Sequence, residues 1–235
     1  MTTPPEPGRL SREVRLVAVA LQFLTRLPVP SFERWDDRWL NDCVRHFPLV
    51  GLLVGSIGGA VLWAAGSLWT PLVAAILAVA TTALVTGAFH EDGLADTFDG
   101  LGGSVGRARA LEIMKDSRIG SYGALALMLV TALRVAGLAA LAAHSLPLAA
   151  LSCALVHAVA RLAPIGLMAA LPYAGDAEHA KAKPLATHVA WVQLGVAGAW
   201  VAAASAAVAH LPSGPGALGV LASLASTATV ACIVY

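Results

Sequence analysis

Three aspartates in the middle of the chain, Asp92, Asp96 and Asp99, have the residue type and spacing of a metal-binding site. They stand at i, i+4 and i+7, which on a helix with 3.6 residues per turn falls within an arc of about 60°. Carboxylates on one face repel each other, and a divalent cation removes that repulsion. Oxygen-only ligands favour a hard ion such as Mg²⁺ or Mn²⁺ that is shared with substrate phosphates. The pattern predicts a metal site that acts on a phosphorylated ligand.

A mixed-charge stretch follows the aspartates. Arg109, Glu112 and Asp116 repeat the helical spacing and are expected to share one face, and Lys115 and Arg118 flank Asp116. Cations beside metal-binding carboxylates suit a ligand whose phosphates they neutralise. Four glycines between the two halves end the acidic helix and give a flexible loop. The alternative is a solvated loop whose charges only separate two membrane spans.

The composition places these residues in a membrane protein. Of the 235 residues, 58% are hydrophobic and only 12% are charged, whereas soluble domains carry about 25% charged residues. We expect one all-α, polytopic, membrane-embedded domain over residues 1–235. The net charge of +1, without a basic run, gives no indication of nucleic-acid binding. The three cysteines lack metal-binding spacing.

The apolar segments predict about six transmembrane helices, preceded by a shorter amphipathic one. Residues 1–12 are expected to be disordered, and residues 13–27 contain an apolar run too short to span a bilayer, which predicts an interfacial or re-entrant helix. Residues 31–47 are read as a loop. The six predicted spans are 48–68, 71–90, 121–143, 146–171, 188–210 and 216–235.

The basic residues predict the orientation of these spans. Thirteen of the fifteen Lys and Arg residues, and all fourteen Asp and Glu residues, lie in segments 1–47, 91–120 and 172–187. These segments are alternate connections, so the positive-inside rule places all three in the cytoplasm.

Two arginines lie inside predicted spans, where a charge is costly unless it faces a carboxylate or a polar cavity. For Arg134 an ion pair that fixes helix packing is favoured, whereas Arg161 is equally suited to packing and to contact with substrate. His157 stands one helical turn before Arg161, so the two are expected to line one cleft. Gly51, Gly55 and Gly59 form a ridge that permits close helix packing.

The chain resembles the cobalamin synthase family, the adenosylcobinamide-GDP ribazoletransferases. The resemblance is carried by H-E-D-G-L-A-D-T-F-D-G (90–100), L-E-I-M-K-D-S-R-I-G-S-Y-G (111–123), F-L-T-R-L-P-V-P (23–30) and F-P-L-V-G-L-L-V-G (47–55). It implies a Mg²⁺-dependent enzyme of the bacterial inner membrane. Such an enzyme transfers the cobinamide-phosphate moiety of adenosylcobinamide-GDP to α-ribazole or its 5′-phosphate and releases GMP, in the last stage of cobalamin biosynthesis. An oligomer is compatible with the resemblance.

The resemblance also implies roles for the charged residues. Asp92, Asp96 and Asp99 would hold one or two Mg²⁺ ions, and Asp116 would be a further ligand. Asp99 and Asp116 are both candidates for the catalytic group that accepts the hydroxyl proton. Phosphate and substrate contacts are expected from Arg107, Arg109, Lys115, Arg118, Arg161 and His157. Residues expected to support this site are His90, Glu91 and Glu112.

One departure and two alternatives accompany this interpretation. Family members usually continue into a segment of the form G-G-x-T-G-D-x-x-G-A, and nothing in residues 214–235 matches it, so that segment is expected to be missing. A CDP-alcohol-type phosphotransferase of lipid synthesis is an alternative, although its D-G-x-x-A-R motif is not met. A membrane transporter built around Arg134 and Arg161 is another, although transporter sites usually lie near mid-membrane.

Overall fold

The structure, a computed structural model, describes residues 9–30, 38–171 and 189–210. In this part of the chain it is all-helical, which confirms the predicted fold class. The helices are α1 (Arg9–Leu24), α2 (Arg38–Asp42), the 3-10 helix η1 (Cys43–His46), α3 (Phe47–Gly66), α4 (Pro71–Thr86), α5 (Phe89–Gly102), α6 (Arg107–Ile113), α7 (Ser121–His144), α8 (Leu146–Ala170) and α9 (Trp191–Ala209).

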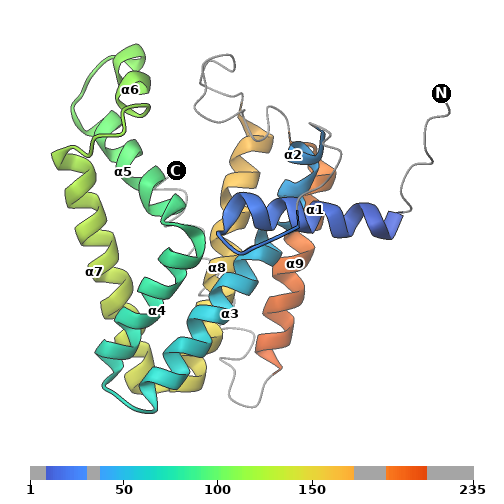
Figure 1. Cartoon of the computed structure of the whole chain (residues 1–235), viewed down its shortest axis with the longest axis vertical. Coiled ribbons are helices and arrows are strands. Elements are labelled where there is room, and N and C mark those ends of the chain that lie inside the picture. The colour runs from blue at the N-terminus through green and yellow to red at the C-terminus, as the bar shows by residue number, and fades with distance from the viewer. Residues whose placement is uncertain (1–8, 31–37, 172–188, 211–235) are drawn as a thin grey trace.

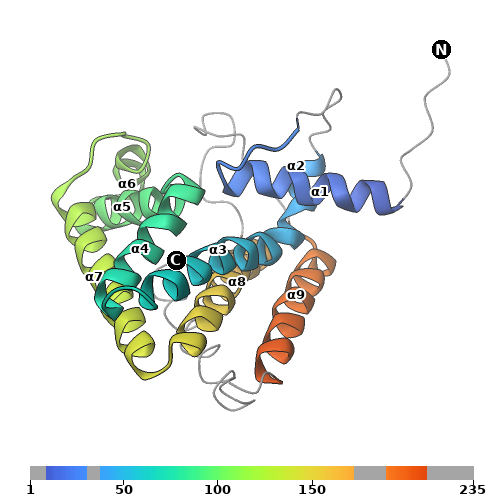
Figure 2. The same cartoon turned by 60° about the horizontal axis from the view of Figure 1, so that its bottom comes forward.

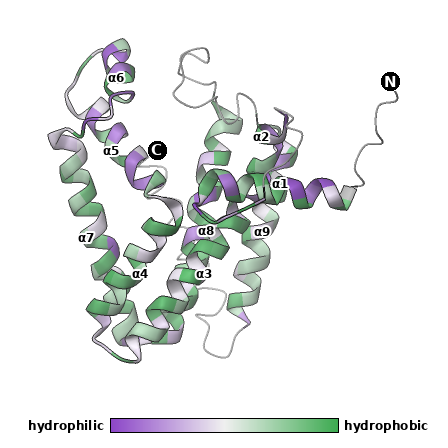
Figure 3. Ribbon diagram, in the orientation of Figure 1, coloured by the Kyte–Doolittle hydropathy of each residue, from purple (hydrophilic) through white to green (hydrophobic). Residues whose placement is uncertain are grey.

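Four segments of the described chain are long and apolar enough to cross a membrane: residues 38–66, which end in α3, and helices α7, α8 and α9. A fifth span results if α4 and α5 are counted together, although they are bent by 89°. Apolar residues dominate α3, α4, α7, α8 and α9, and polar residues gather on α1, α5 and α6 (Figure 3). The predicted span 216–235 lies outside the described residues.

The α3–α8 pair forms the centre of the bundle, with α9 packed beside it (Figures 1 and 2). A Cβ added at Gly55 would lie 2.5 Å from the Cys153 carbonyl oxygen, and one at Gly59 would lie 2.5 Å from that of Ala150. One added at Gly51 would overlap the His157 carbonyl oxygen in the same way. Because a side chain at any of these positions would hold the two backbones apart, the predicted glycine ridge is confirmed as the α3–α8 contact.

A sharp corner joins α4 to α5, and it shortens the second predicted span. Gly87 and Ala88 both adopt left-handed backbone conformations, with φ of 67° and 58°. The Gly87 and Ala88 amides donate to the carbonyl oxygens of Leu84 and Ala83, the hydrogen-bond pattern that terminates many helices. The prediction that the span continues to His90 is therefore wrong, because α4 ends at Thr86.

The N-terminal predictions also need correction. The first helix begins at Arg9 rather than after residue 12, and an ion pair from Arg12 to Asp42 fixes its first turns to α2. It ends at Leu24, three residues before the predicted limit. The described part of the predicted loop 31–47 is helical instead, since α2 and η1 lead directly into α3. Residues of η1 are buried against α1, which explains why this polar segment is ordered.

Candidate functional site

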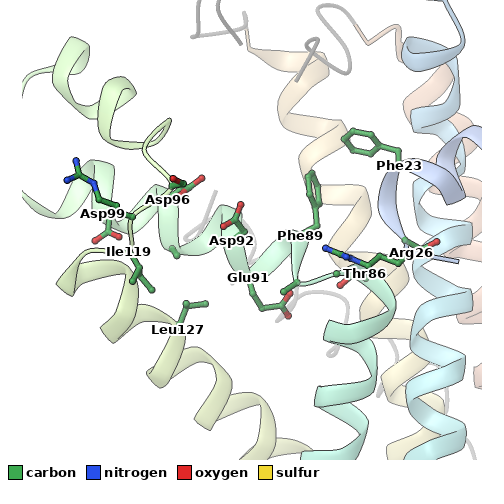
Figure 4. Close-up of a pocket in the computed structure, with 16 residues that line it drawn as sticks. Phe23, Arg26, Thr86, Phe89, Glu91, Asp92, Asp96, Asp99, Ile119 and Leu127 are labelled. Atoms are coloured by element: carbon green, nitrogen blue, oxygen red, sulfur yellow. The ribbon is translucent and has the colours of Figure 1, made fainter. Parts of the chain in front are cut away.

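A pocket of about 600 Å³ lies where α5, the start of α7 and the end of α1 meet. Acidic side chains of α5 occupy one wall (Figure 4). The lining residues are Phe23, Thr25, Arg26, Thr86, Gly87, Ala88, Phe89, Glu91, Asp92, Ala95, Asp96, Asp99, Ser117, Arg118, Ile119 and Leu127.

The three predicted metal ligands share this wall. Asp92, Asp96 and Asp99 all lie on α5 and all line the pocket (Figure 4). The i, i+4, i+7 spacing therefore does place them on one helix face, as predicted. The corner at Gly87 positions that face, because it turns α5 away from the axis of α4.

Asp99 has a second set of contacts, at the start of α7. One carboxylate oxygen accepts a hydrogen bond from the Gly120 amide at 2.7 Å, and the other accepts one from the Gly123 amide at 2.8 Å. A Cβ at either glycine would overlap the Asp99 carboxylate. Asp99 thus satisfies two of the amides that every helix leaves unpaired at its N-terminus, and it joins α5 to α7.

The donor chemistry of the pocket fits a hard cation such as Mg²⁺. Four carboxylate side chains line it and supply oxygen ligands. One of their oxygens, Oε2 of Glu91, is buried without a hydrogen bond to the described residues. In the described chain, however, no three His, Cys, Asp or Glu side chains are gathered around one point. Magnesium is commonly held by only one or two carboxylates together with water and substrate phosphates. Asp92 and Asp96 line the pocket and could supply such ligands, and Asp99 is held by two amides of α7.

The predicted second acidic face does not form. Helix α6 ends at Ile113, so Asp116 lies beyond it and does not share a helix face with Arg109 and Glu112. Asp116 instead pairs with Arg118, with 2.6 Å between Oδ2 and the guanidinium, and this contact raises the pKa of Arg118. Arg118 lines the pocket and Asp116 does not.

The other predicted phosphate ligands of this segment lie outside the pocket lining. Arg109 pairs with Glu112 at 2.6 Å, and both side chains are about two-thirds exposed. Neither Arg107 nor Lys115 is among the lining residues. Of the basic residues predicted between 91 and 120, the pocket therefore brings only Arg118 to the acidic wall.

The two intramembrane arginines have different partners. Arg134 of α7 pairs with Glu91 of α5 at 2.8 Å, which confirms the predicted ion pair between helices. Arg161 is 5% exposed and donates to the His157 carbonyl oxygen at 2.9 Å. Both Arg161 and His157 pack against the α3 glycines rather than lining the pocket, and His90 also lies outside the lining.

Sequence reasoning missed the wall that faces the acidic helix. Phe23 lies in the last turn of α1, Thr25 and Arg26 follow that helix, and Thr86 is the last residue of α4. In the sequence, Arg26 is one of the thirteen basic residues whose distribution predicts the orientation of the spans. Its place in F-L-T-R-L-P-V-P was the available signal, since that motif carried part of the family resemblance.

The fold and the pocket define a class: a helical membrane protein with a carboxylate-rich pocket suited to phosphate chemistry. The particular family is given by the model "Cobalamin-5-phosphate synthase", which matches residues 16–235, and the chain belongs to this family. Its activity is therefore that of a cobalamin synthase, which acts at the last step of cobalamin biosynthesis.

Named relatives agree with this assignment. A protein of Leptothrix cholodnii called adenosylcobinamide-GDP ribazoletransferase is 51% identical over 198 residues, which cover 84% of this chain and 75% of that protein. Proteins with the same name from Albidiferax ferrireducens and Shewanella sp. (strain ANA-3) are 46% and 45% identical, over 77% and 75% of this chain and 68% of each relative. No solved structure matches the chain.

Proposed function

We propose that this chain transfers the cobinamide-phosphate moiety of adenosylcobinamide-GDP to α-ribazole or its 5′-phosphate and releases GMP. The observation that carries the proposal is the face of α5, where Asp92, Asp96 and Asp99 line one pocket together with Arg26 and Arg118. Carboxylates for a metal ion and guanidinium groups for phosphate suit a diphosphate donor. The names of the relatives support this choice of substrate.

The residues have separate tasks in this reaction. Asp92 and Asp96 would hold Mg²⁺, which when bound neutralises charge on the diphosphate. Arg118, held by Asp116, contacts phosphate at the α7 end of the pocket. Of the two candidate bases only Asp99 lines the pocket, so we assign to it the proton of the attacking ribose hydroxyl. Phosphoryl transfer depends mainly on positioning and charge neutralisation, so most of the rate comes from the first two tasks.

The proposed location is the bacterial inner membrane, with the pocket open to the cytoplasm. In support, α2, α6 and the C-terminal end of α8 lie toward one end of the bundle (Figure 1). The basic loops that the positive-inside rule assigns to the cytoplasm adjoin these elements. Substrates dissolved in the cytoplasm would then reach the α5 face without crossing the bilayer.

Replacing one metal ligand tests the proposal. In membrane vesicles supplied with adenosylcobinamide-GDP, α-ribazole and Mg²⁺, Asp96→Asn is expected to lower GMP release by about 100-fold or more, because charge neutralisation by a metal contributes several kcal/mol. Asp42→Asn is the matched control, since Asp42 lies outside the pocket lining and pairs with Arg12 and Gln193. Full activity of Asp96→Asn, or wild-type activity that persists when Mg²⁺ and other divalent ions are chelated, would contradict the metal site.

A further inference from the structure

We infer that Arg26 binds a phosphate of the diphosphate donor, at the end of the pocket opposite Asp99 (Figure 4). The inference rests on the proposed function and adds to it a substrate-binding residue from a part of the chain distant in sequence. It follows from how the backbone of residue 26 is held, from the space beside its side chain, and from the balance of charge in the pocket.

The fold fixes the backbone of Arg26 against α4. Its amide donates to the Val85 carbonyl oxygen at 2.8 Å, so the chain that leaves α1 is joined to the last turn of α4. Thr25, only 7% exposed, closes the end of α1 through a hydrogen bond from its hydroxyl to the Leu21 carbonyl oxygen at 2.7 Å. Phe23 adds an edge-to-face contact with Phe89 of α5, with ring centroids 5.3 Å apart. The start of the Arg26 side chain is therefore positioned by three separate contacts.

Gly87 leaves room for the side chain of Arg26. A Cβ at Gly87 would overlap Nε of Arg26 and would lie 3.0 Å from both Cδ and Cζ. The guanidinium therefore passes directly over the backbone of the α4–α5 corner. The left-handed conformation of Gly87, with φ of 67°, independently favours glycine here. The corner thus combines two functions: it turns α5, and it admits an arginine beside the acidic wall.

The charged residues that line the pocket indicate what the Arg26 guanidinium binds. The lining holds four carboxylates and two guanidinium groups. Glu91 is paired with Arg134, and Arg118 is paired with Asp116. For the Arg26 guanidinium, no hydrogen bond or ion pair to the described residues is found, although it lines a pocket whose metal would attract an anion. Guanidinium groups bind phosphate through paired N–H donors, which a diphosphate can accept.

The test separates donor binding from the rest of the reaction. Arg26→Gln, Arg26→Lys and the control Arg12→Gln are placed in vesicles or nanodiscs. Arg12 lies on α1, the helix that ends just before Arg26. It is paired with Asp42 at the surface and is absent from the pocket lining. Binding of adenosylcobinamide-GDP without acceptor is measured by equilibrium dialysis, followed by the absorbance of the corrin ring. KM for each substrate and kcat are then measured by GMP release.

We expect Arg26→Gln to weaken donor binding by about 10- to 100-fold, the usual effect of losing a charge-assisted hydrogen bond. The KM for α-ribazole should stay within about twofold of the wild-type value, and Arg26→Lys should recover part of the donor affinity because it restores the charge. A merely structural role for Arg26 would lower the melting temperature and would not separate the two KM values.

Three results would overturn the inference: unchanged donor binding by Arg26→Gln, an equal loss in Arg12→Gln, or a change confined to the KM for α-ribazole. The comparison of KM values requires that the wild-type chain turns over, whereas donor binding is measured without turnover. A wild-type chain that releases no GMP from this donor would instead overturn the proposed function. The two failures are therefore distinguishable in one set of measurements.

Discussion

At the scale of single residues, Asp99 connects the candidate site to the packing of α5 against α7. Its carboxylate lines the pocket and also receives the Gly120 and Gly123 amides of α7. These two hydrogen bonds hold the carboxylate of an α5 residue against the first turn of α7. A change at this contact should therefore affect both the stability of the α5–α7 pair and the position of the neighbouring carboxylates.

Gly123→Ala tests this contact without changing any charged group. The added methyl group would overlap the Asp99 carboxylate and lie 2.8 Å from the Ala95 carbonyl oxygen. We expect a loss of about 1–3 kcal/mol in stability, as for other overpacked sites, and a fall in GMP release. The measurement is thermal unfolding in detergent together with activity in vesicles.

Gly137→Ala is the matched control, because it makes the same change in the same helix with no atom within 4 Å of the new methyl group. It should leave activity unchanged and stabilise α7 by up to about 1 kcal/mol, since alanine is the better helix former. Equal effects of the two substitutions would show that the Asp99 contact is unimportant.

The sequence predicted part of this residue-scale arrangement. The shared face of Asp92, Asp96 and Asp99 follows from helical periodicity alone, and the ion pair of Arg134 follows from the cost of a charge within a span. Periodicity failed at Asp116, because the prediction required α6 to continue beyond Ile113. The approach of Arg26 to Gly87 depends on tertiary packing between helices distant in sequence, which no local pattern encodes.

At the scale of helices, the α3–α8 contact was predictable and the α4–α5 corner was not. Three glycines spaced by four residues indicated a packing face, although only the structure identifies α8 as the partner. The corner was missed because residues 87–89 continue an apolar segment, and Ala88 has an ordinary helix-forming side chain. Its left-handed φ of 58° is imposed by the hydrogen bonds that end α4.

Gly55→Leu tests the contact between α3 and α8. Its Cβ would lie 2.5 Å from the Cys153 carbonyl oxygen and 2.7 Å from Cα of Ala154, both of them backbone atoms that a side-chain rotation cannot move. We expect a destabilisation of about 3 kcal/mol, at the upper end of overpacking effects, seen as a lower melting temperature and lower yield of folded protein.

Ser56→Leu adds the same side chain at the next position of α3, which is exposed on the outside of the bundle. It should be tolerated, because an apolar residue there faces lipid or detergent. A normal melting temperature for Gly55→Leu would show that α3 and α8 are not packed as the structure describes.

At the scale of the whole molecule, the helices set which loops share a side of the membrane. Helix α3 leads to Ser67, in the turn before α4, and helix α5 leads to Ser104, in the loop before α6. If α4 and α5 together cross the bilayer once, these two serines lie on opposite sides. The positive-inside rule assigns Ser104 to the cytoplasm, because the basic residues follow it.

Cysteine labelling tests that orientation. In a chain whose three native cysteines are replaced by alanine, Ser67→Cys is expected to react with a membrane-impermeant maleimide in intact spheroplasts, and Ser104→Cys only after the membrane is permeabilised. GMP release by both variants confirms that each is folded. Labelling of Ser104→Cys in intact spheroplasts would contradict the cytoplasmic placement of the pocket.

The early end of α4 has a consequence for the lipid around it. Its 16 residues cover about 24 Å at 1.5 Å per residue, whereas the hydrocarbon core of a bilayer is about 30 Å thick. A span that is too short is accommodated by local thinning of the membrane. If α4 crosses the bilayer by itself and the membrane thins around it, the acidic helix α5 starts below the average level of the lipid headgroups. The depth of the site relative to the headgroups would then depend on the acyl-chain length of the host membrane.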